Sequence, residues 1–317
     1  METIYFLVQQ TMLFSIPLLL VALGGMFSER SGVVNIALEG IMIIGAFTGI
    51  FFISRFGNLF SPTITLFIAI IISALSGLIF SLLHAYASIN MSADQVISGT
   101  ALNIFAPAFA IYVTRAIQVV QQISFVNNFR IESVPVLGNI PIIGNLLFKN
   151  SYITTYLGFI ILALSWFALY KTRFGLRLRS CGEHPQAADS VGINVYKMRY
   201  FGVAISGALA GIGGLVFVIP TSTNFNATVA GYGFLALAVL IFGQWKPIRI
   251  LYAAFFFGLM KTLASAYSGI PILSNLPISN SVYKMIPYIT TIIVLAFTSK
   301  NSQAPKSSGL PYDKSVR

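Results

Sequence analysis

The chain has 317 residues, of which 56% are hydrophobic and only 9% are charged, and its formal net charge is +11 at pH 7. Soluble domains carry about 25% charged residues, so this composition excludes a protein whose whole surface faces water. Long apolar runs between short polar stretches instead predict membrane-spanning helices of about 20 residues each. The runs lack the strict alternation that a transmembrane β-barrel requires. We therefore expect an all-α integral membrane protein.

Nine segments are long and apolar enough to be spanning helices, and together they form one transmembrane domain over residues 1–299. The first has no Lys or Arg before its apolar run, which argues against a secretory signal peptide. The second contains Gly45 and Gly49, and two half-helices there would raise the count to ten. The sequence leaves this count open, and with it the side of the N-terminus. The nine segments are 4–27, 36–54, 63–87, 95–117, 152–170, 200–219, 229–245, 248–268 and 284–299.

Three polar regions lie outside these spans. Residues 118–151 are rich in Pro, Gly and Asn and predict an extracellular loop. Residues 300–317 are polar and rich in Pro and Ser, which predicts a disordered tail. The segment 171–199 holds six of the 19 basic residues, and the tail holds four more. Because Lys and Arg concentrate in cytoplasmic loops, we place both in the cytoplasm.

The positive charge therefore covers an inner surface that faces anionic lipid and a protein partner. Aromatic and basic residues do not alternate along these segments, so no nucleic acid partner is expected. The two histidines and the single cysteine form no metal-binding or catalytic pattern. We expect neither a catalytic residue nor a bound metal.

A short helix is predicted within the basic segment. Pro185 suits the first helical position, because its missing N–H is not needed there. Gly192 suits the position just past the end, where a left-handed residue is favoured. Ala187, Ala188 and Val191 are expected on one side at helical spacing. This small face fits either a docking surface for another protein or an ordinary loop helix, and these residues alone do not decide between the two.

Polar residues also interrupt the first two spans, in the stretch MFSERSGVVNIALEGIMIIG. Glu29 and Arg30 are expected at a membrane edge, whereas Asn35 and Glu39 lie deeper. Ionisable groups inside a membrane usually face the bundle interior or a watery cavity. Glu39 has a second interpretation, as a carboxylate that stabilises a helix N-terminus. With Asn103, a polar residue in the fourth span, Asn35 and Glu39 are our candidates for a substrate pathway.

Two other features of the spans are informative. In GALAGIGG, Gly207 and Gly211 have the spacing that lets two helices approach closely, so we assign them to helix packing. Lys261 interrupts an apolar span, where it either extends to the membrane surface or pairs across the bundle.

The basic segment resembles the coupling loop of ABC-transporter permeases of the ribose and branched-chain amino acid group. The likeness runs from about residue 10 to residue 299. His184 departs from the Asn that the family usually has. Three stretches, SERSGVVNIALEGIM, PVLGNIPIIGNLLF and GYGFLALAVLIFGQWKP, are similar to the bacterial nucleoside permeases of guanosine type within that group. The matching residues of the coupling loop are Gly182, Glu183, Pro185, Ala187, Ala188, Gly192, Ile193 and Asn194.

The resemblance implies a permease subunit of a type II ABC importer with about 9–10 transmembrane helices, in the bacterial cytoplasmic membrane. It implies two ATPase subunits, a second and often non-identical permease, an extracellular substrate-binding lipoprotein, and a nucleoside as substrate. It places contacts with the ATPase at Glu183, Pro185, Ala187, Ala188 and Gly192.

The sequence itself is consistent with a permease that leaves ATP binding to a separate subunit. The phosphate-binding motif G-x-x-x-x-G-K-[ST] is missing, so the chain is expected to carry no cofactor, and ATP is expected on a partner subunit. A permease of the same type for a simple sugar such as ribose remains an alternative. A secondary transporter is less favoured, because its coupling site usually accompanies paired broken helices in two repeats, and no clear internal repeat is seen.

Overall fold

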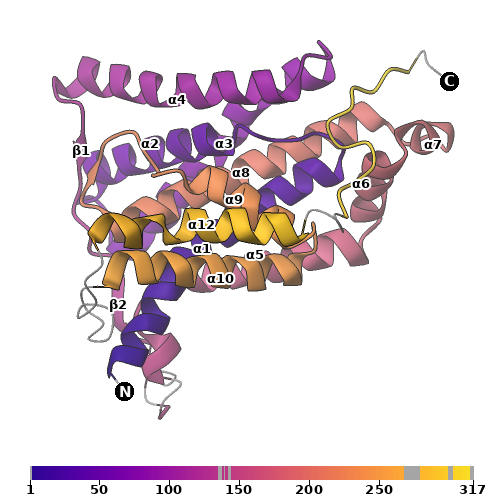
Figure 1. Cartoon of the computed structure of the whole chain (residues 1–317). Helices are drawn as coiled ribbons and strands as arrows, with labels where there is room; N and C mark the ends of the chain where they lie inside the picture. Colours follow the sequence, from indigo (N-terminus) through magenta and orange to yellow (C-terminus); the bar gives the residue numbers. More distant parts are fainter. Residues whose placement is uncertain are drawn as a thin grey trace.

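The computed structural model describes residues 2–134, 138, 140–141, 144–267, 279–298 and 303–314, and it is a bundle of helices with a few short strands (Figure 1). Within these residues, seven helices are long and apolar enough to cross a membrane. They are α1 (Glu2–Arg30), α2 (Leu38–Phe56), α3 (Pro62–Ile89), α4 (Gln95–Gln118), α5 (Ile153–Lys171), α8 (Val195–Thr221) and α10 (Pro247–Ala266). Two further apolar helices are α9 (Tyr232–Phe242) and α12 (Asn280–Thr298).

Each of these nine helices corresponds to one predicted span, with two differences. α2 is one continuous helix, so the alternative of two half-helices within 36–54 is wrong. The predicted span 229–245 contains only α9, whose 11 residues extend about 16 Å at 1.5 Å per residue. A hydrocarbon layer is about 30 Å thick, so α9 crosses about half of it.

α8 lies at the centre of the bundle and packs against α1, α2 and α3. Its contact with α3 is a seam of glycine and serine. A Cβ on Gly211 would overlap the carbonyl oxygen of Ser73, and a Cβ on Gly207 would overlap the hydroxyl of Ser81. Ser73 Oγ in turn donates to the carbonyl oxygen of Gly45 on α2, at 2.8 Å. Small residues allow this close approach of helix backbones, which is the packing role assigned to Gly207 and Gly211.

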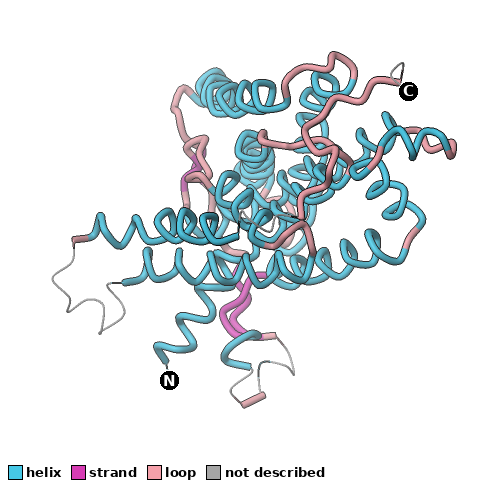
Figure 2. Tube along the Cα trace, turned by 45° about the vertical axis from the view of Figure 1, so that its right-hand side comes forward, coloured by secondary structure: helices cyan, strands magenta, loops and turns pink. Residues whose placement is uncertain are grey.

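The two ends of the bundle differ in charge. α6 (Arg173–Glu183) and α7 (Pro185–Ser190) project at one end, beside the C-terminal segment (Figure 1). The short strands lie away from that segment, as Figure 2 also shows. The end with α6 and α7 carries the basic cluster, so we assign it to the cytoplasm by the distribution of Lys and Arg. The members of the cluster are Lys171, Arg173, Arg177, Arg179, Lys197 and Arg199.

The segment 118–151 is more ordered than the loop expected from its composition. β1 (Ile123–Ser124) pairs antiparallel with β4 (Asn224–Phe225), and β2 (Arg130–Ser133) pairs with β3 (Lys149–Tyr152). A helical turn at Gly144–Phe148 precedes β3. Residues 135–137, 139 and 142–143, which belong to the PVLGNIPIIGNLLF stretch, lie outside the described residues.

The C-terminal segment 303–314 is packed against the bundle, so the expectation of disorder is wrong for these residues. Tyr312 is only 5% exposed. Ser307 N donates to the carbonyl oxygen of Gly182 at 2.9 Å, and Gly309 N to that of Gly32 at 3.2 Å. Backbone hydrogen bonds and the burial of one aromatic side chain hold this segment in place despite its polar composition. Residues 300–302 and 315–317 of the predicted tail lie outside the described residues.

The glycine seam yields a stability prediction. Gly211→Val should destabilise the protein by about 1–3 kcal/mol or more, because the added atoms meet the backbone of α3. Ala208→Val, at a partly exposed position of the same helix, is the control and should change stability little. Thermal unfolding of both variants in detergent checks this. Equal melting temperatures would contradict the role of the seam.

Candidate functional site

The chain is non-helical at a point deep inside the bundle, between α1 and α2. Asn35 Nδ2 donates to Ser206 Oγ at 2.9 Å, and Gly45 lies against Gly211. Ser206 and Gly211 both belong to the middle third of the 27-residue α8. Residues 31–37 therefore enter the membrane layer without forming a helix, and α2 begins well below the membrane surface.

A second break separates α8, which ends at Thr221, from α9, which does not begin until Tyr232. The Glu39 carboxylate joins the two breaks. Its Oε1 accepts from the backbone N–H of Gly231 at 2.9 Å, and its Oε2 accepts from that of Gly233 at 2.6 Å. A negative charge is favourable at a helix N-terminus, where backbone N–H groups have no partner within the helix. The first turn of α2 thus supplies the anion that stabilises the first turn of α9.

The backbone of the first break is bonded to polar side chains. Val34 N donates to Gln95 Oε1 at 2.7 Å, and the carbonyl oxygen of Val34 accepts from His84 Nε2 at 2.9 Å. Asn103 bridges the start of α2: its Nδ2 donates to the carbonyl oxygen of Ile36 at 2.8 Å, and its Oδ1 accepts from Gly40 N at 2.7 Å. Non-helical backbone at membrane depth requires such partners, because lipid offers none.

The structure therefore brings together all three candidate pathway residues, Asn35, Glu39 and Asn103, around the start of α2. Each side chain bonds within the chain, and together they hold the two breaks in place. Their assignment to a substrate pathway stays a prediction. The contribution of His84 and Gln95 was not predicted from the sequence. The available signal was their polarity, since each belongs to an apolar helix, but neither forms a local motif.

Glu29 and Arg30 were expected at a water-facing membrane edge, but both are largely buried. Trp245 Nε1 donates to Glu29 Oε2 at 2.6 Å, and Arg30 Nη2 donates to the carbonyl oxygen of Trp245 at 3.0 Å. Arg30 Nη1 also lies 3.7 Å from Glu183 Oε1. The end of α1 thus connects Trp245, three residues after the end of α9, to Glu183, the last residue of α6. Glu29 is hydrogen-bonded to the indole of Trp245, and Arg30 is paired with Glu183. These partners explain how the two side chains are accommodated without full solvation.

The short helix α7 forms at the predicted place, but its faces differ from the prediction. Gly192 has the expected left-handed conformation, with φ of +83°. Ala188 is buried at 3% exposure, whereas Ala187 is exposed and Val191 is 75% exposed. Placing all three on one side was wrong, because successive helical residues point about 100° apart. Ala187 and Val191, four positions apart, form the outward face.

The buried side of α7 packs against its own chain. Ala188 lies in a small apolar cluster with Cys181, Val195 and Tyr312. Pro185 is also buried. Glu183 is partly exposed and holds Arg30, as described above. Of the five predicted docking residues, Ala187 and Gly192 are exposed, Glu183 is partly exposed, and Pro185 and Ala188 are buried.

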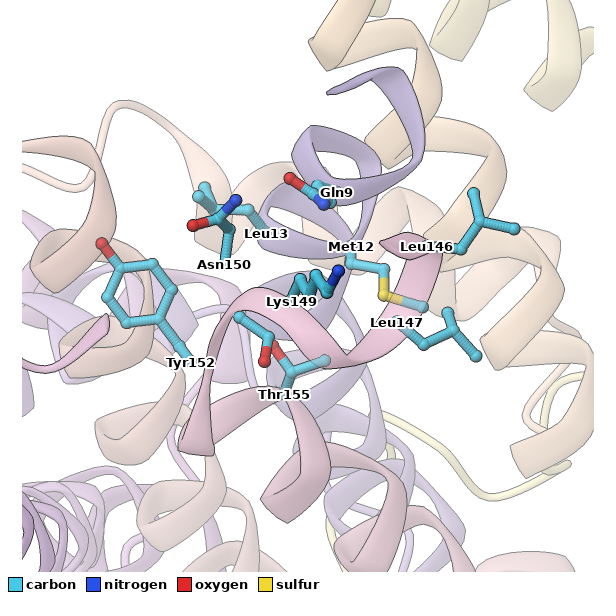
Figure 3. Close-up of a pocket in the computed structure, with 10 residues that line it drawn as sticks. Gln9, Met12, Leu13, Leu146, Leu147, Lys149, Asn150, Tyr152 and Thr155 are labelled. Carbon is cyan, nitrogen blue, oxygen red and sulfur yellow. The ribbon is translucent and has the colours of Figure 1, made fainter. Parts of the chain in front are cut away.

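The clefts of the described chain differ greatly in size. Figure 3 shows one that is lined by residues of α1, among them Gln9, Met12 and Leu13, and by residues of the segment 146–155, among them Lys149 and Tyr152. Its volume of about 20 Å³ has room for only a water or two. A larger cleft of about 440 Å³ lies between the outer end of α4 and the segment that precedes α9. It is lined by Ile111, Arg115, Val119, Val120, Gln121, Gln122 and Asn226.

Helices that start inside the membrane, beside a polar cytoplasmic helix pair, are typical of a transport protein. The chain belongs to the family described as "Branched-chain amino acid transport system / permease component", whose profile matches residues 7–295. It is thus a multi-pass transport subunit of the membrane and not an enzyme.

Three curated relatives are nucleoside permeases by name. The chain is 42% identical over 315 residues to the nucleoside ABC transporter permease protein NupC of Lactococcus lactis subsp. cremoris, covering 99% of this chain and 98% of that one. It is 44% identical over 313 residues to the guanosine ABC transporter permease protein NupQ of Bacillus subtilis, covering 98% and 97%. It is 27% identical over 267 residues to the nucleoside ABC transporter permease protein NupB, also of Lactococcus lactis, covering 80% and 72%. No solved structure matches the chain.

The carboxylate at the start of α9 leads to the next prediction. Glu39→Gln should loosen α9, because the amide nitrogen that replaces one carboxylate oxygen cannot accept from a backbone N–H. Hydrogen exchange at Gly231 and Gly233 should accelerate about tenfold or more. Glu132→Gln, at an exposed position of β2, is the matched control and should exchange as the wild type does. Unchanged exchange in Glu39→Gln would contradict the stabilising role.

The cluster beneath α7 can be tested with the natural cysteine. Burial raises the pKa of the Cys181 thiol from 9.0 to about 11, even though Arg199 and Ser180 act in the opposite direction. Only the thiolate reacts, so labelling by a maleimide should be slow at pH 7 and should rise about tenfold per pH unit towards pH 11. Tyr312→Ala should speed labelling at every pH by uncovering the thiol. Fast labelling of the wild type at pH 7 would contradict this packing.

Proposed function

We propose that this chain is one of two permease subunits of an ATP-driven importer that moves nucleosides into the cell. The observation that carries the transport role is the meeting of α2 and α9 inside the membrane, each beginning at a break in the backbone. The substrate class is supported by the relatives NupC and NupQ, which match nearly the whole chain and are named for nucleosides. The simple-sugar and secondary-transporter alternatives have no comparable support.

The remaining subunits follow from this role. ATP would be bound by separate ATPase subunits on the cytoplasmic side, because the chain lacks a phosphate-binding motif. A second, non-identical permease is supported by the two related nucleoside permeases of Lactococcus lactis, NupC and NupB. An extracellular lipoprotein would deliver the nucleoside to the end of the bundle that carries β1 and β4.

Coupling between ATP hydrolysis and transport would use bonds that are present in the structure. The ATPase would press on the outward face of α7, at Ala187 and Val191. Glu183, at the end of α6, is paired with Arg30, which also holds the carbonyl oxygen of Trp245, just after α9. A displacement of α7 would therefore be transmitted to the C-terminal end of the half-helix α9. The N-terminal end of α9 is hydrogen-bonded to Glu39. Alternating access requires such an element with two discrete positions, biased by ligands.

Nucleoside uptake is the direct test of the proposed function. Cells that express the chain with its ATPase, second permease and lipoprotein should accumulate radiolabelled guanosine, and the uptake should require ATP. A catalytically dead ATPase in the same cells is the control. No nucleoside uptake by the complete set of wild-type subunits would refute the proposal.

Val191→Glu is a separate test of docking through α7. It places a charge on the outward face, and a buried, unpaired charge at an interface should weaken copurification of the ATPase about tenfold or more. Val126→Glu is a matched control, since Val126 is 74% exposed and Val191 is 75% exposed, but Val126 lies in the extracellular segment. Normal ATPase binding by Val191→Glu would rule out docking through this face. Ala188→Glu is unsuitable, because it would disrupt the cluster with Tyr312.

A further inference from the structure

The segment between β4 and α9 has one buried edge and one exposed edge. Phe225, Ala227 and Val229 are 2%, 5% and 0% exposed. The residues between them, Asn226 and Thr228, are exposed, as is the following Ala230. The burial alternates although the backbone is left-handed at Ala227 and Ala230, with φ of 55° and 54°, and the exposed residues form an edge that leads from β4 towards the start of α9.

The environment of this edge follows from its depth. The segment ends at Gly231, which bonds to Glu39 well inside the bundle. Irregular backbone inside a membrane does not face lipid, because its polar groups would lack partners, and it occurs only against protein or beside a water-filled cavity. The first break meets this condition by burial, since Val33, Asn35 and Ala37 are all 0% exposed. The second break is exposed along this edge in the single subunit. The surrounding that we infer for it is a water-filled cavity between this chain and the proposed second permease.

At its outer end this edge joins the cleft of about 440 Å³, which is within the size range of small-molecule sites, about 300–1,000 Å³. Asn226 is a member of both. The cleft also contains the guanidinium of Arg115 and the amides of Gln121 and Gln122, but no acidic side chain. Gln121 lies against Arg115. A guanidinium carries five donors, more than one amide oxygen can accept, so donors remain for a ligand.

The cleft also has an apolar part of its lining. Ile111 and Val120 line it, and so does Val119, which is 89% exposed and has a left-handed backbone conformation, with φ of 65°. Apolar surface combined with a few donors suits a flat, neutral molecule that carries hydrogen-bond acceptors at one edge. A cation is disfavoured, because it would meet the guanidinium and no acidic side chain.

We propose that this cleft is the site where the permease first binds the base of a purine nucleoside, with Arg115 and Asn226 as the residues that read it. An arginine fork matches the two acceptors O6 and N7 of guanine, and an asparagine amide offers both a donor and an acceptor. The nucleoside then passes along the edge of Asn226, Thr228 and Ala230 to Phe234, which is 52% exposed in the first turn of α9. Its ring provides a face on which a base stacks. The choice of a nucleoside rests on the proposed function, whereas the location of the site rests on the cleft and the exposed edge.

The test compares guanosine with uridine, which lacks the O6 and N7 edge. Uptake is measured in the complete transporter with the lipoprotein saturated, so that differences among variants report on the permease. Arg115→Ala should lower the ratio of guanosine to uridine uptake about tenfold. Asn226→Ala should slow guanosine uptake, whereas Asn128→Ala should not. Asn128 is the matched control, an exposed amide beside a smaller cleft of about 130 Å³.

A binding measurement accompanies the uptake assay. Asn226→Cys, in a Cys181→Ser background, should react with a small water-soluble thiol reagent, and guanosine supplied with the lipoprotein should slow this reaction. Wild-type uptake with unchanged selectivity in Arg115→Ala, or labelling of Asn226→Cys that guanosine does not affect, would overturn the site and leave the proposed function standing. Absence of nucleoside uptake in the wild type would overturn both. Copurification of the ATPase should be the same for all these variants.

Discussion

One carboxylate between two helix beginnings determines the arrangement of the centre of the molecule. Glu39 belongs to the first turn of α2, yet its oxygens accept from Gly231 and Gly233 at the start of α9. Two spans can therefore begin inside the membrane, because each break is held by partners from elsewhere in the chain. Without this bond, the N–H groups of α9 would face the membrane interior unpaired, at a cost of several kcal/mol per group.

This arrangement depends on close packing around it. The seam of Gly77, Gly207 and Gly211 brings α3 against α8, and Gly45 brings α2 against α8. The residues that bond the first break then come within reach, among them His84 from α3. Larger side chains at the seam would move α3 outwards and carry His84 away from Val34. The packing of small residues and the polar network are in this sense one structural unit.

Part of this organisation could be predicted from the sequence. Composition and apolar runs predicted the helices, and the polarity of Asn35, Glu39 and Asn103 marked an unusual point in the membrane. Periodicity could not reveal that Glu39 bonds to Gly231, because the two positions are 192 residues apart and neither belongs to a local motif. For the same reason, the polar composition of residues 303–314 concealed the buried Tyr312, whose partners lie on α6, α7 and α8.

The covering of α7 by the last part of the chain sets an order of events during synthesis. Tyr312 lies over Ala188 and Cys181, and the carbonyl oxygen of Leu310 accepts from Arg199 at 3.0 Å. Because a polypeptide is made from its N-terminus onwards, Cys181, Ala188 and Arg199 lack these partners until residues 310–312 have left the ribosome. The cytoplasmic face around α7 is therefore completed only after residues 310–312 have been made. A product that stops before Leu310 leaves the apolar residues Cys181, Ala188 and Val195 without the cover of Tyr312.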